Sequence, residues 1–299
     1  MKPCVSGMHL QQNHNKTVTD RTMKKFGLIG HPIAHSLSPA LFKAAFGGKY
    51  TYDLIEEDAF EKAYGRFIEK YDAINVTAPF KEAAYRKADS SSEECQAIGA
   101  ANILIKGQEI LAANSDVLGV TGALQQYGIG SNPHGKALIV GCGGAAMAAA
   151  YAVWKELGHD TFIINRNVEK ARQFATRLKA ATGGMQRLEA AGLEKFRELF
   201  RQSDVIIYTL PLAISSIHKL NRRDIRGGIF RSRRKVILEA NYKEPAFTQE
   251  LTDAMLKANR KLTFIPGQEW LLHQAIGAYR FFVSDEPDIK QMRKVISAP

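Results

Sequence analysis

The segment Asn75–Lys81, with the sequence NVTAPFK, combines residue types and a spacing that could perform chemistry. Residues 73–77 predict a buried strand that stops at Pro79, where the chain is predicted to restart as a helix that carries Lys81 in its first turn. The N-terminus of a helix bears partial positive charge and favours acids, so a lysine there is electrostatically unfavourable. We therefore expect either an anion beside the Lys81 ammonium or a tuned pKa of that group. The alternative is a solvated surface lysine.

A glycine-rich turn further along the chain predicts a nucleotide site. It follows an apolar strand and opens an alanine-rich helix, which is the arrangement of the dinucleotide fingerprint. Its residues are Gly141, Gly143, Gly144, Ala145 and Ala146. Gly141 permits the tight turn, Gly143 lets the backbone approach a pyrophosphate, and Ala146 is small enough for the helix to pack on the strand. The free N–H groups at the helix start would bind the phosphates. A purely structural glycine turn is the alternative.

The end of the next strand indicates which cofactor this site takes. NAD sites usually have an acid there, which binds the ribose 2′-hydroxyl. This strand ends instead in Asn165-Arg166-Asn167, and the next acid is Glu169. A guanidinium can bind a 2′-phosphate through two hydrogen bonds and stack on the adenine. We therefore expect NADP, with an exposed loop residue as the alternative for Arg166.

Two serines precede a helix that is predicted to begin at Pro39. Ser38 suits the N-cap position of that helix, which would be a structural role. Ser36 and Ser38 together, beside free helix N–H groups, could also hold a small carboxylate. His31 and His35 are expected to be turn residues, since no Ser/His/Asp arrangement is evident.

Strand and helix patterns alternate along most of the chain, which predicts an α/β architecture with mainly parallel sheets. Strands are predicted over residues 25–29, 51–55, 73–77, 102–105, 109–112, 136–140, 161–164, 205–210, 236–240 and 262–265. Helices are predicted over 39–46, 60–71, 117–127, 270–282 and 289–296, with one more beginning near Lys81 and one ending near Leu157. The polar stretch 128–135 predicts a surface connection into a second unit.

Length and composition narrow the class of protein. The chain has 299 residues, enough for two domains, and its 45% apolar and 24% charged content is typical of a soluble globular protein. No apolar run is long enough for a membrane span, and Met1–Thr22 lacks the apolar segment of a secretory signal. The three cysteines have no metal-ligand spacing, so we expect no metal site and a reduced, cytoplasmic compartment.

The formal net charge of +11 could indicate nucleic acid or acidic small molecules as ligands. The densest basic cluster consists of Arg222, Arg223, Arg226, Arg231, Arg233, Arg234 and Lys235. No aromatic residues alternate with these side chains as base-stacking platforms, so we do not expect nucleic-acid binding. A solvated or phosphate-facing loop is the prediction.

Several ordered motifs resemble those of the shikimate dehydrogenase family. They are Ser36-Leu37-Ser38-Pro39, Asn75–Lys81, Gly99-Ala100-Ala101-Asn102, Asn114-Ser115-Asp116-x-x-Gly119, the nucleotide glycines with Asn165-Arg166, and the pattern from Gly267 through Gln274. The resemblance covers roughly residues 24–285 in order, and so many ordered motifs together are specific.

The resemblance implies a fold and a domain division. The fold is a discontinuous N-terminal substrate domain with a mixed sheet, over residues 23–117 and 269–299, plus a Rossmann NADP-binding domain over 118–268. The active site is expected in the cleft between them. Residues 1–22 are expected to be a disordered or loosely attached extension, and translation from Met23 is an alternative.

The resemblance also implies NADP-dependent interconversion of 3-dehydroshikimate and shikimate, a step of chorismate and aromatic amino acid biosynthesis. Lys81 and Asp116 would be the catalytic pair, because a lysine ammonium held by a carboxylate can polarise and protonate the developing alkoxide. An N-capping aspartate is the structural alternative for Asp116. By the same resemblance, Ser36 and Ser38 would bind the substrate carboxylate, and Thr77, Asn102, Asp116, Gln274 and Tyr242 would contact the rest of the substrate. Gly267 would contact the cofactor.

Alternatives remain open at this stage. A paralogue could act on quinate or a related cyclitol acid, or use NAD. A regulatory protein could bind a nucleotide without turnover and engage an acidic partner through its basic loop, although retention of Lys81 and Asp116 argues against this. We expect a small-molecule substrate, no nucleic acid, no membrane, and a monomer or homodimer.

The chain departs from the family pattern at three places around the expected nicotinamide pocket. Tyr208-Thr209-Leu210-Pro211 stands where the family has an Asn-Ala-Thr run. Glu239 replaces an aspartate, and Lys243-Glu244-Pro245 replaces Asn-Pro. Gln268-Glu269-Trp270 lacks the expected methionine. We expect these changes to weaken NADP and NAD binding alike.

Overall fold

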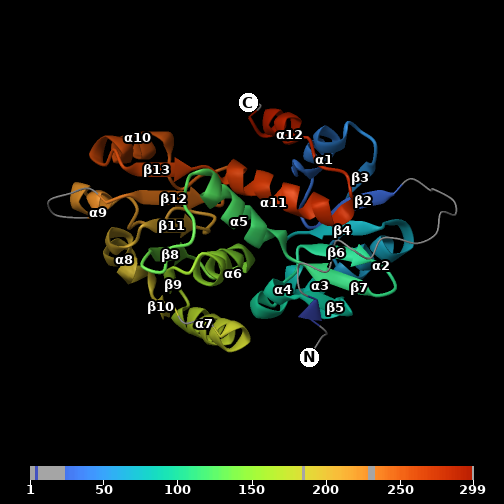
Figure 1. The fold of residues 1–299 in the computed structure, drawn as a ribbon, viewed down its shortest axis with the longest axis horizontal. Helices are drawn as coiled ribbons and strands as arrows, with labels where there is room; N and C mark the ends of the chain where they lie inside the picture. Colours follow the sequence, from blue (N-terminus) through green and yellow to red (C-terminus); the bar gives the residue numbers. More distant parts are fainter. Residues whose placement is uncertain (1–3, 6–23, 184–185, 228–232, 298–299) are drawn as a thin grey trace. The chain divides into compact units, whose positions relative to one another are not determined.

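The computed structural model describes residues 4–5, 24–183, 186–227 and 233–297, and Figure 1 traces their path. The chain divides into two compact units, each taken by itself below. Unit 1 comprises Met1–Gly119 and Leu272–Pro299, and unit 2 comprises Val120–Leu271. The predicted boundaries at 117/118 and 268/269 fall within a few residues of this division. The assignment of one part to substrate and the other to cofactor stays a prediction.

Unit 1 is built on a mixed sheet, as predicted. Within the described residues its strand order is β1-β5-β7-β6-β4-β2-β3, and the β4–β6 and β6–β7 pairs are antiparallel while the others are parallel. The strands are β1 (Cys4–Val5), β2 (Lys25–Gly30), β3 (Thr51–Glu56), β4 (Ala73–Val76), β5 (Ser90–Ser92), β6 (Ile103–Lys106) and β7 (Ile110–Ala113). The helices are α1 (Ser38–Phe46), α2 (Phe60–Lys70), α3 (Lys81–Lys87), α4 (Glu93–Ile98) and α12 (Ile289–Ile296), together with parts of α5 (Ser115–Gln126) and α11 (Gly267–Phe282).

An aromatic cluster joins the two chain segments of unit 1. Phe26 of β2 stacks on Phe282 of α11 with ring centroids 5.2 Å apart, and Phe42 of α1 meets Tyr279 of α11 edge-on at 4.9 Å. Both phenylalanines from the N-terminal part are buried. Rings of this size bury large apolar areas, so the cluster is a strong reason for the C-terminal helix to pack back on the N-terminal segment. The predicted return of the C-terminal helices onto the N-terminal part is confirmed for α11.

One short strand lies in the segment that was predicted to be an unattached extension. Cys4 and Val5 form β1, which pairs in parallel with Ser91 and Ser92 of β5. At these two residues the chain is therefore paired with the sheet. The remainder of that prediction, for residues 1–3 and 6–22, lies outside the described residues.

Unit 2 has the strand order of a dinucleotide-binding fold. Within the described residues its order is β10-β9-β8-β11-β12-β13, and every pair is parallel. Counted from β8, this is the order 3-2-1-4-5-6. The strands are β8 (Lys136–Val140), β9 (Asp160–Ile164), β10 (Leu188–Ala191), β11 (Val205–Tyr208), β12 (Lys235–Glu239) and β13 (Leu262–Ile265). The helices are α6 (Gly144–Tyr151), the π-helical η1 (Ala152–Glu156), α7 (Val168–Thr182), η2 (Leu193–Lys195), α8 (Phe196–Gln202), α9 (Arg222–Arg226) and α10 (Gln249–Ala258). The predicted α/β class with a mixed sheet and a Rossmann sheet is confirmed.

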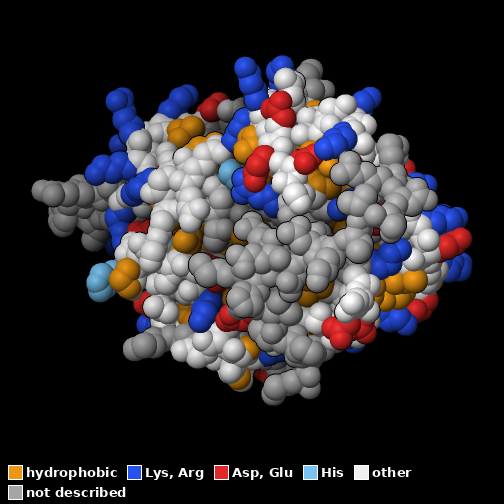
Figure 2. Space-filling model, turned by 45° about the vertical axis from the view of Figure 1, so that its right-hand side comes forward, with side chains coloured by type: hydrophobic (Ala, Val, Ile, Leu, Met, Phe, Trp, Pro, Cys, Tyr) orange, Lys and Arg blue, Asp and Glu red, His pale blue; other side chains and the backbone are white. Residues whose placement is uncertain are grey.

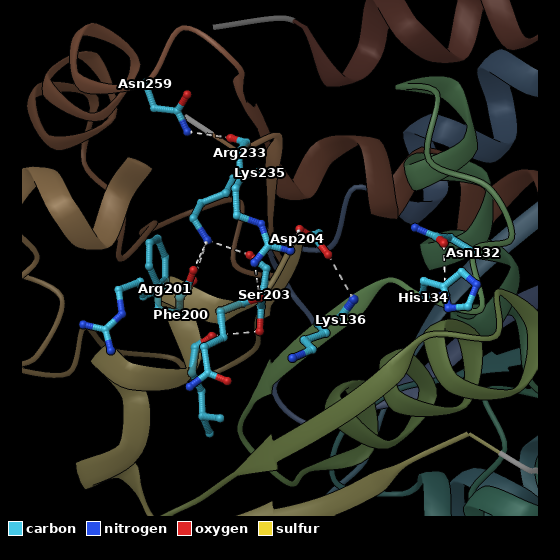
Figure 3. A network of polar contacts seen from close by, with 12 residues as sticks. Asn132, His134, Lys136, Phe200, Arg201, Ser203, Asp204, Arg233, Lys235 and Asn259 are labelled. Atoms are coloured by element: carbon cyan, nitrogen blue, oxygen red, sulfur yellow. Dashed lines mark hydrogen bonds and ion pairs between the residues drawn. The ribbon is translucent and has the colours of Figure 1, made fainter. Parts of the chain in front are cut away.

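Three members of the basic cluster, Arg233, Arg234 and Lys235, hold the structure together at the end of this sheet where β11 and β12 begin. Lys235 is buried, and its Nζ donates to the carbonyls of Phe200, Arg201 and Ser203 at 2.6, 3.2 and 2.6 Å, at the end of α8 (Figure 3). Arg234 donates to two carbonyls that follow α5, and Arg233 pairs with Asp204. For Lys235 the prediction of a solvated or phosphate-facing side chain is therefore wrong. The structure does not describe Arg231.

Other charged side chains are mixed at the surface. On the face shown in Figure 2, Lys and Arg side chains are interspersed with Asp and Glu side chains. Several such neighbours form exposed ion pairs, for example Lys62 with Asp58 and Arg280 with Glu286. Exposed pairs of this kind contribute little to stability because water and salt screen them.

His159 provides a test of the packing in unit 2. The residue is buried against the turn at Gly135, and among the described residues its Nδ1 has no hydrogen-bond partner. Burial lowers the pKa of His159 because it disfavours the charged ring. The unfolded chain therefore binds a proton here more readily than the folded chain. The free energy of unfolding should therefore be unaffected by His159 above about pH 6.5. It should fall as the pH drops below that value.

Urea unfolding at several pH values measures this effect. We expect the free energy of unfolding of the wild type to fall more steeply between about pH 6.5 and pH 5 than that of His159→Gln, which cannot take up the proton. His218 is exposed, so His218→Gln should follow the wild-type curve. Parallel curves for the wild type and His159→Gln would show that His159 does not titrate in this way.

Candidate functional site

Lys81 and Asp116 form a close ion pair in unit 1. Lys81 is the first residue of α3, and its Nζ lies 2.6 Å from Oδ2 of Asp116 in the first turn of α5. The two side chains are 20% and 5% exposed, so the pair is mostly shielded from water while the lysine keeps an open side. The anion expected beside Lys81 is therefore Asp116. A charge-assisted hydrogen bond of this length orients the ammonium group.

The side chain of Asn114 holds the start of the helix that carries Asp116. Oδ1 of Asn114 accepts the N–H of Asp116 at 3.0 Å, and Nδ2 of Asn114 donates to the carbonyl of Ala100 at 3.1 Å. The helix begins at Ser115, so the alternative that Asp116 is an N-cap is wrong. The backbone N–H of Ala101 in turn donates to the carbonyl of Lys81 at 2.9 Å. The segment around residue 100 thus ties the two helix starts together.

Asn102 is engaged within the protein. It is fully buried, and its Oδ1 accepts the N–H of Ser115 at 2.7 Å while its Nδ2 donates to the Ser115 hydroxyl at 3.2 Å. Both amide atoms therefore hold the start of α5. A contact of Asn102 with a substrate hydroxyl would add to this role or replace one of these bonds.

The two serines lie together at the start of α1. Leu37 occupies the N-cap position and Ser38 is the first helical residue, so the prediction of Ser38 as the N-cap is wrong. The Ser38 N–H instead donates to Oγ of Ser36 at 3.2 Å, and the two hydroxyls lie 3.1 Å apart. Ser38 also contacts the buried hydroxyl of Tyr52, whose pKa is raised by burial, and Tyr52 donates to Oδ1 of Asn75 at 2.8 Å.

Thr77 lies next to this serine segment at the carboxyl ends of two parallel strands. Its N–H donates to the carbonyl of Ile29 in β2 at 2.9 Å, and the N–H of His31 donates to the carbonyl of Ala78 at 3.1 Å. A Cβ at Gly30 would overlap the Thr77 side chain, so glycine is needed for this approach. Gln274 is partly buried on α11, a helix whose Tyr279 hydroxyl donates to the carbonyl of Ser38 at 3.3 Å. The serine, threonine and lysine segments are thus neighbours within unit 1.

The glycine turn of unit 2 has the geometry expected of the fingerprint. Gly141 has φ 118°, and a side chain there would overlap the Thr209 hydroxyl. Gly143 precedes α6, and a Cβ added to it would have no atom within 4 Å. Ala146 is buried against the sheet. Open space at Gly143 and the free N–H groups of Gly144 and Ala145 leave room for an anionic group to approach the backbone.

The loop after β9 presents an unengaged guanidinium. Asn167 caps α7 by accepting the N–H of Lys170 at 3.1 Å, and Nδ2 of Asn165 donates to the Asn167 carbonyl at 3.0 Å. Arg166 between them is exposed, and within the part of the chain that the structure describes its side chain makes no hydrogen bond or ion pair. The loop is therefore held by its asparagines while Arg166 is available to a ligand.

The segments that depart from the family pattern are well ordered by internal bonds. Tyr208 and Glu239 are fully buried at the ends of β11 and β12. Burial raises the pKa of Glu239, while hydrogen bonds from the N–H groups of Ala246 and Phe247 oppose that shift. A Cβ on Gly267 would lie 2.7 Å from the Glu239 carbonyl oxygen, so Gly267 must be glycine for α11 to begin here. Burial also raises the pKa of Tyr242.

Some residues that support the site could not be identified from sequence patterns. Tyr52 stands in no motif, and its place in the hydrogen-bond chain from Ser38 to Asn75 depends on strand pairing between β2 and β3. Asn75 and Asn114 stand within the motifs quoted above. Their place in these motifs is the one sequence feature that could have indicated a role in the site. Among the described residues, no group of three or more His, Cys, Asp or Glu side chains could hold a metal ion. No helix in those same residues is both long and apolar enough to cross a membrane.

Comparisons with known proteins cover both units. Residues 28–104 match the shikimate dehydrogenase substrate binding domain, and residues 124–227 match the shikimate / quinate 5-dehydrogenase domain. A shikimate dehydrogenase (NADP(+)) from Methanococcus maripaludis is 30% identical over 290 residues, covering 93% of this chain and 98% of that protein.

Solved structures agree in fold. Shikimate dehydrogenase from Mycobacterium tuberculosis is 28% identical with a TM-score of 0.74, covering 92% of this chain and 98% of the other. Shikimate 5-dehydrogenase from Thermus thermophilus, in complex with NADP(H) and shikimate, is 28% identical with a TM-score of 0.72 over the same shares.

Proposed function

Because this chain belongs to the shikimate dehydrogenase family, we propose that it catalyses the NADP-dependent interconversion of 3-dehydroshikimate and shikimate. The observation that carries the proposal is the ion pair between Lys81 and Asp116, 2.6 Å apart and mostly shielded from water. Lys81 lies within the part of the chain that matches the family's substrate-binding domain. A pair of this kind is suited to move a proton, whereas a protein that only binds nucleotide has no need of it.

The proposed chemistry divides between a proton and a hydride. When bound, NADPH supplies the hydride that reduces the ketone. The Lys81 ammonium donates a hydrogen bond to the ketone oxygen, polarises the carbonyl and gives up its proton as negative charge develops on that oxygen. Asp116 holds the ammonium in place through a charge-assisted hydrogen bond. In the reverse direction neutral Lys81 takes the proton from the substrate hydroxyl.

We propose substrate contacts for the remaining residues of unit 1. Ser36 and Ser38, whose hydroxyls lie 3.1 Å apart, would bind the carboxylate. Thr77 and Gln274 would bind ring hydroxyls. Asn102 would do so while it also holds Ser115. Tyr242 of unit 2 is proposed as a further substrate contact.

NADP fits the residues of unit 2. Open space at Gly143 and the free N–H groups of Gly144 and Ala145 would accept the pyrophosphate, while Gly141 and Ala146 shape the turn. Asn165 and the unengaged Arg166 would hold the adenosine 2′-phosphate. Gly267 would contribute through the backbone of the first turn of α11. A place in chorismate biosynthesis, a cytoplasmic location and a monomeric or homodimeric state stay predictions.

Arg166→Ala is expected to remove most of the preference for NADP over NAD. A charge-assisted bidentate contact contributes about 1.5–3 kcal/mol, which corresponds to roughly ten- to a hundredfold in affinity at about 1.4 kcal/mol per decade. The change should come mainly from weaker NADP binding, since NAD lacks the phosphate. Steady-state kinetics with both cofactors measures it.

Arg172→Ala is the matched control for this variant. Arg172 lies on α7 close to Arg166, is exposed, and pairs only loosely with Glu169 at 3.7 Å. It should leave the cofactor preference unchanged. A wild type that prefers NAD, or an Arg166→Ala enzyme that keeps its selectivity, would show that Arg166 does not read the phosphate.

Four parallel assays of the wild type test the proposed function itself. Shikimate and quinate are each offered with NADP and with NAD, and formation of the reduced cofactor is followed by absorbance. We expect the highest kcat/KM for shikimate with NADP. A higher value for quinate would make the protein a quinate dehydrogenase, and no turnover in any assay would favour a regulatory nucleotide-binding protein.

A further inference from the structure

Tyr208 folds the loop after β11 back onto the end of its own strand. Its hydroxyl donates to the carbonyl of Leu212 at 2.6 Å and accepts the N–H of Ile214 at 3.1 Å. Its buried ring packs edge-on against Phe247, with centroids 5.6 Å apart. One hydroxyl therefore fixes two backbone groups of the loop, and the ring is anchored in the core. Burial raises the pKa of this hydroxyl to about 12, so it stays protonated and able to donate.

The same loop is also fastened where it begins. The N–H and the hydroxyl of Thr209 both donate to the carbonyl of Val140, at 3.0 and 2.8 Å. Val140 is the last residue of β8 and precedes the turn at Gly141, whose missing side chain leaves room for the Thr209 hydroxyl. The loop therefore borders the glycine turn directly and is held at both of its ends.

Asn241 ties the loop after β12 to this first loop. Its Nδ2 donates to the carbonyl of Pro211 at 3.3 Å and to that of Glu244 at 2.7 Å. Its Oδ1 accepts the N–H groups of Lys243 and Glu244 at 3.1 and 3.2 Å. This single side chain closes the turn that carries Tyr242 and links it to the neighbouring loop.

The location of these bonds gives them a functional meaning. In a parallel sheet of order 3-2-1-4-5-6, the dinucleotide binds beyond the carboxyl ends of the strands, where the strand order reverses. That point lies at β8, and β11 is the adjacent strand that begins the second half of the sheet. The loops after β11 and β12 therefore lie on the other side of β8 from the loop after β9, which carries Arg166. Binding to loops that are already fixed costs less conformational entropy than binding to free ones.

We propose that Tyr208 and Asn241 are positioning residues that hold the loops after β11 and β12 for the nicotinamide end of the cofactor. The proposal rests on the proposed function. Tyr208 belongs to a segment in which this chain departs from its family's pattern, and Asn241 lies between two such departures, Glu239 and Lys243-Glu244-Pro245. Neither side chain needs to touch the cofactor, since both act through the backbone of the loops.

Binding of two ligands to the same variants tests the proposal. The ligands are NADP and 2′-phospho-ADP-ribose, which has the adenosine phosphate and pyrophosphate but no nicotinamide. The variants are Tyr208→Phe, which keeps the ring, and Asn241→Asp, which keeps the Oδ1 acceptor and loses the Nδ2 donor. We expect each to weaken NADP about 3- to 10-fold, the effect of one or two lost hydrogen bonds, and to bind 2′-phospho-ADP-ribose like the wild type. The double variant should fall short of the product of the two effects, because both residues hold the same loop.

Two control variants separate positioning from general destabilisation. Tyr71→Phe loses a tyrosine hydroxyl bond to Asp53 in unit 1. Asn259→Ala loses amide bonds to the carbonyls of Ile225 and Arg233, at the opposite end of the sheet of unit 2. Both should lower stability and leave NADP affinity unchanged.

Each remaining result overturns the proposal in a distinct way. Wild-type NADP affinity in Tyr208→Phe and Asn241→Asp would show that the loops need no such anchors. Equal weakening of both ligands would show a general structural effect rather than one at the nicotinamide end. Failure of the wild type to bind NADP at all would overturn the proposed function together with this inference, and so differs from the other two results.

Discussion

Lys81→Met should lower turnover by at least about 100-fold, the usual effect of removing a general acid–base group, while NADP binds almost as it does to the wild type. Methionine keeps the length and the apolar stem of lysine but cannot donate a proton. The substitution also leaves the Asp116 carboxylate, whose side chain is 5% exposed, without its partner at 2.6 Å. The measurements are kcat for shikimate oxidation and the dissociation constant for NADP.

Asp116→Asn and the double variant test whether the two residues act as a unit. Asp116→Asn should also be severely impaired, because the ammonium loses the charge that orients it. The double variant should be much less impaired than the product of the two single effects. Lys62→Met is the matched control, since Lys62 forms an exposed pair with Asp58 at 3.0 Å, and its activity should be that of the wild type. Near-normal turnover of Lys81→Met would remove Lys81 from the chemistry.

Lys235→Met should destabilise the protein by about 3 kcal/mol, because three carbonyl groups, two of them in buried bonds, would lose their donor at a cost of about 1–3 kcal/mol for each buried group. Lys235 is fully buried, and its Nζ is the donor to the carbonyls of Phe200, Arg201 and Ser203 (Figure 3). Burial lowers the pKa of Lys235 to about 8, so near neutral pH the group is still mainly protonated and has a hydrogen for each acceptor. Methionine keeps the length and apolar character of the stem but removes the ammonium, whose Nζ lies 5.2 Å from the centroid of the Phe200 ring.

Denaturant unfolding of purified protein measures this loss. Lys195→Met is the control: Lys195 lies in the same unit, is exposed and pairs with Glu198 at 3.1 Å, so its loss should change the free energy of unfolding by less than about 0.5 kcal/mol. A Lys235→Met protein as stable as the control would mean that the three carbonyls find water or other donors. The enzyme's activity at low temperature should survive in both variants, since Lys235 lies at the end of the sheet opposite to the glycine turn.

The pairing of Lys81 with Asp116 could be foreseen because local physics pointed to it. A lysine in the first turn of a helix needs an anion, and the order of motifs supplied a candidate 35 residues later along the chain. The N-cap roles foreseen for Ser38 and Asp116 were wrong for a shared reason. Each helix begins one residue or more before the position that the sequence suggested, so the side chain before it, Ser36 or Asn114, accepts the free N–H.

The fold was predictable where hydrophobic patterns are strong and was missed where they are weak. Most strands of both sheets are continuous apolar runs, as buried parallel strands are. Three serines form β5, a composition that disfavours a strand prediction, and pairing with β7 decides its structure. No element is predicted from the sequence patterns at α7, β10, α8, α9 or α10. Their burial against the sheet of unit 2 depends on contacts that are distant in sequence, for example those of Phe196, Phe200 and Met255 within one core cluster.

Transfer of deuterium from substrate to cofactor tests the central claim most directly. The wild type is given NADP and shikimate that carries deuterium on the carbon of the hydroxyl to be oxidised. We expect reduced cofactor to form with one deuterium per molecule, as direct hydride transfer requires, and Lys81→Met to form it at least about 100-fold more slowly. No reduced cofactor, or NADPH that carries no deuterium, would contradict the assignment of this protein as an NADP-dependent shikimate dehydrogenase.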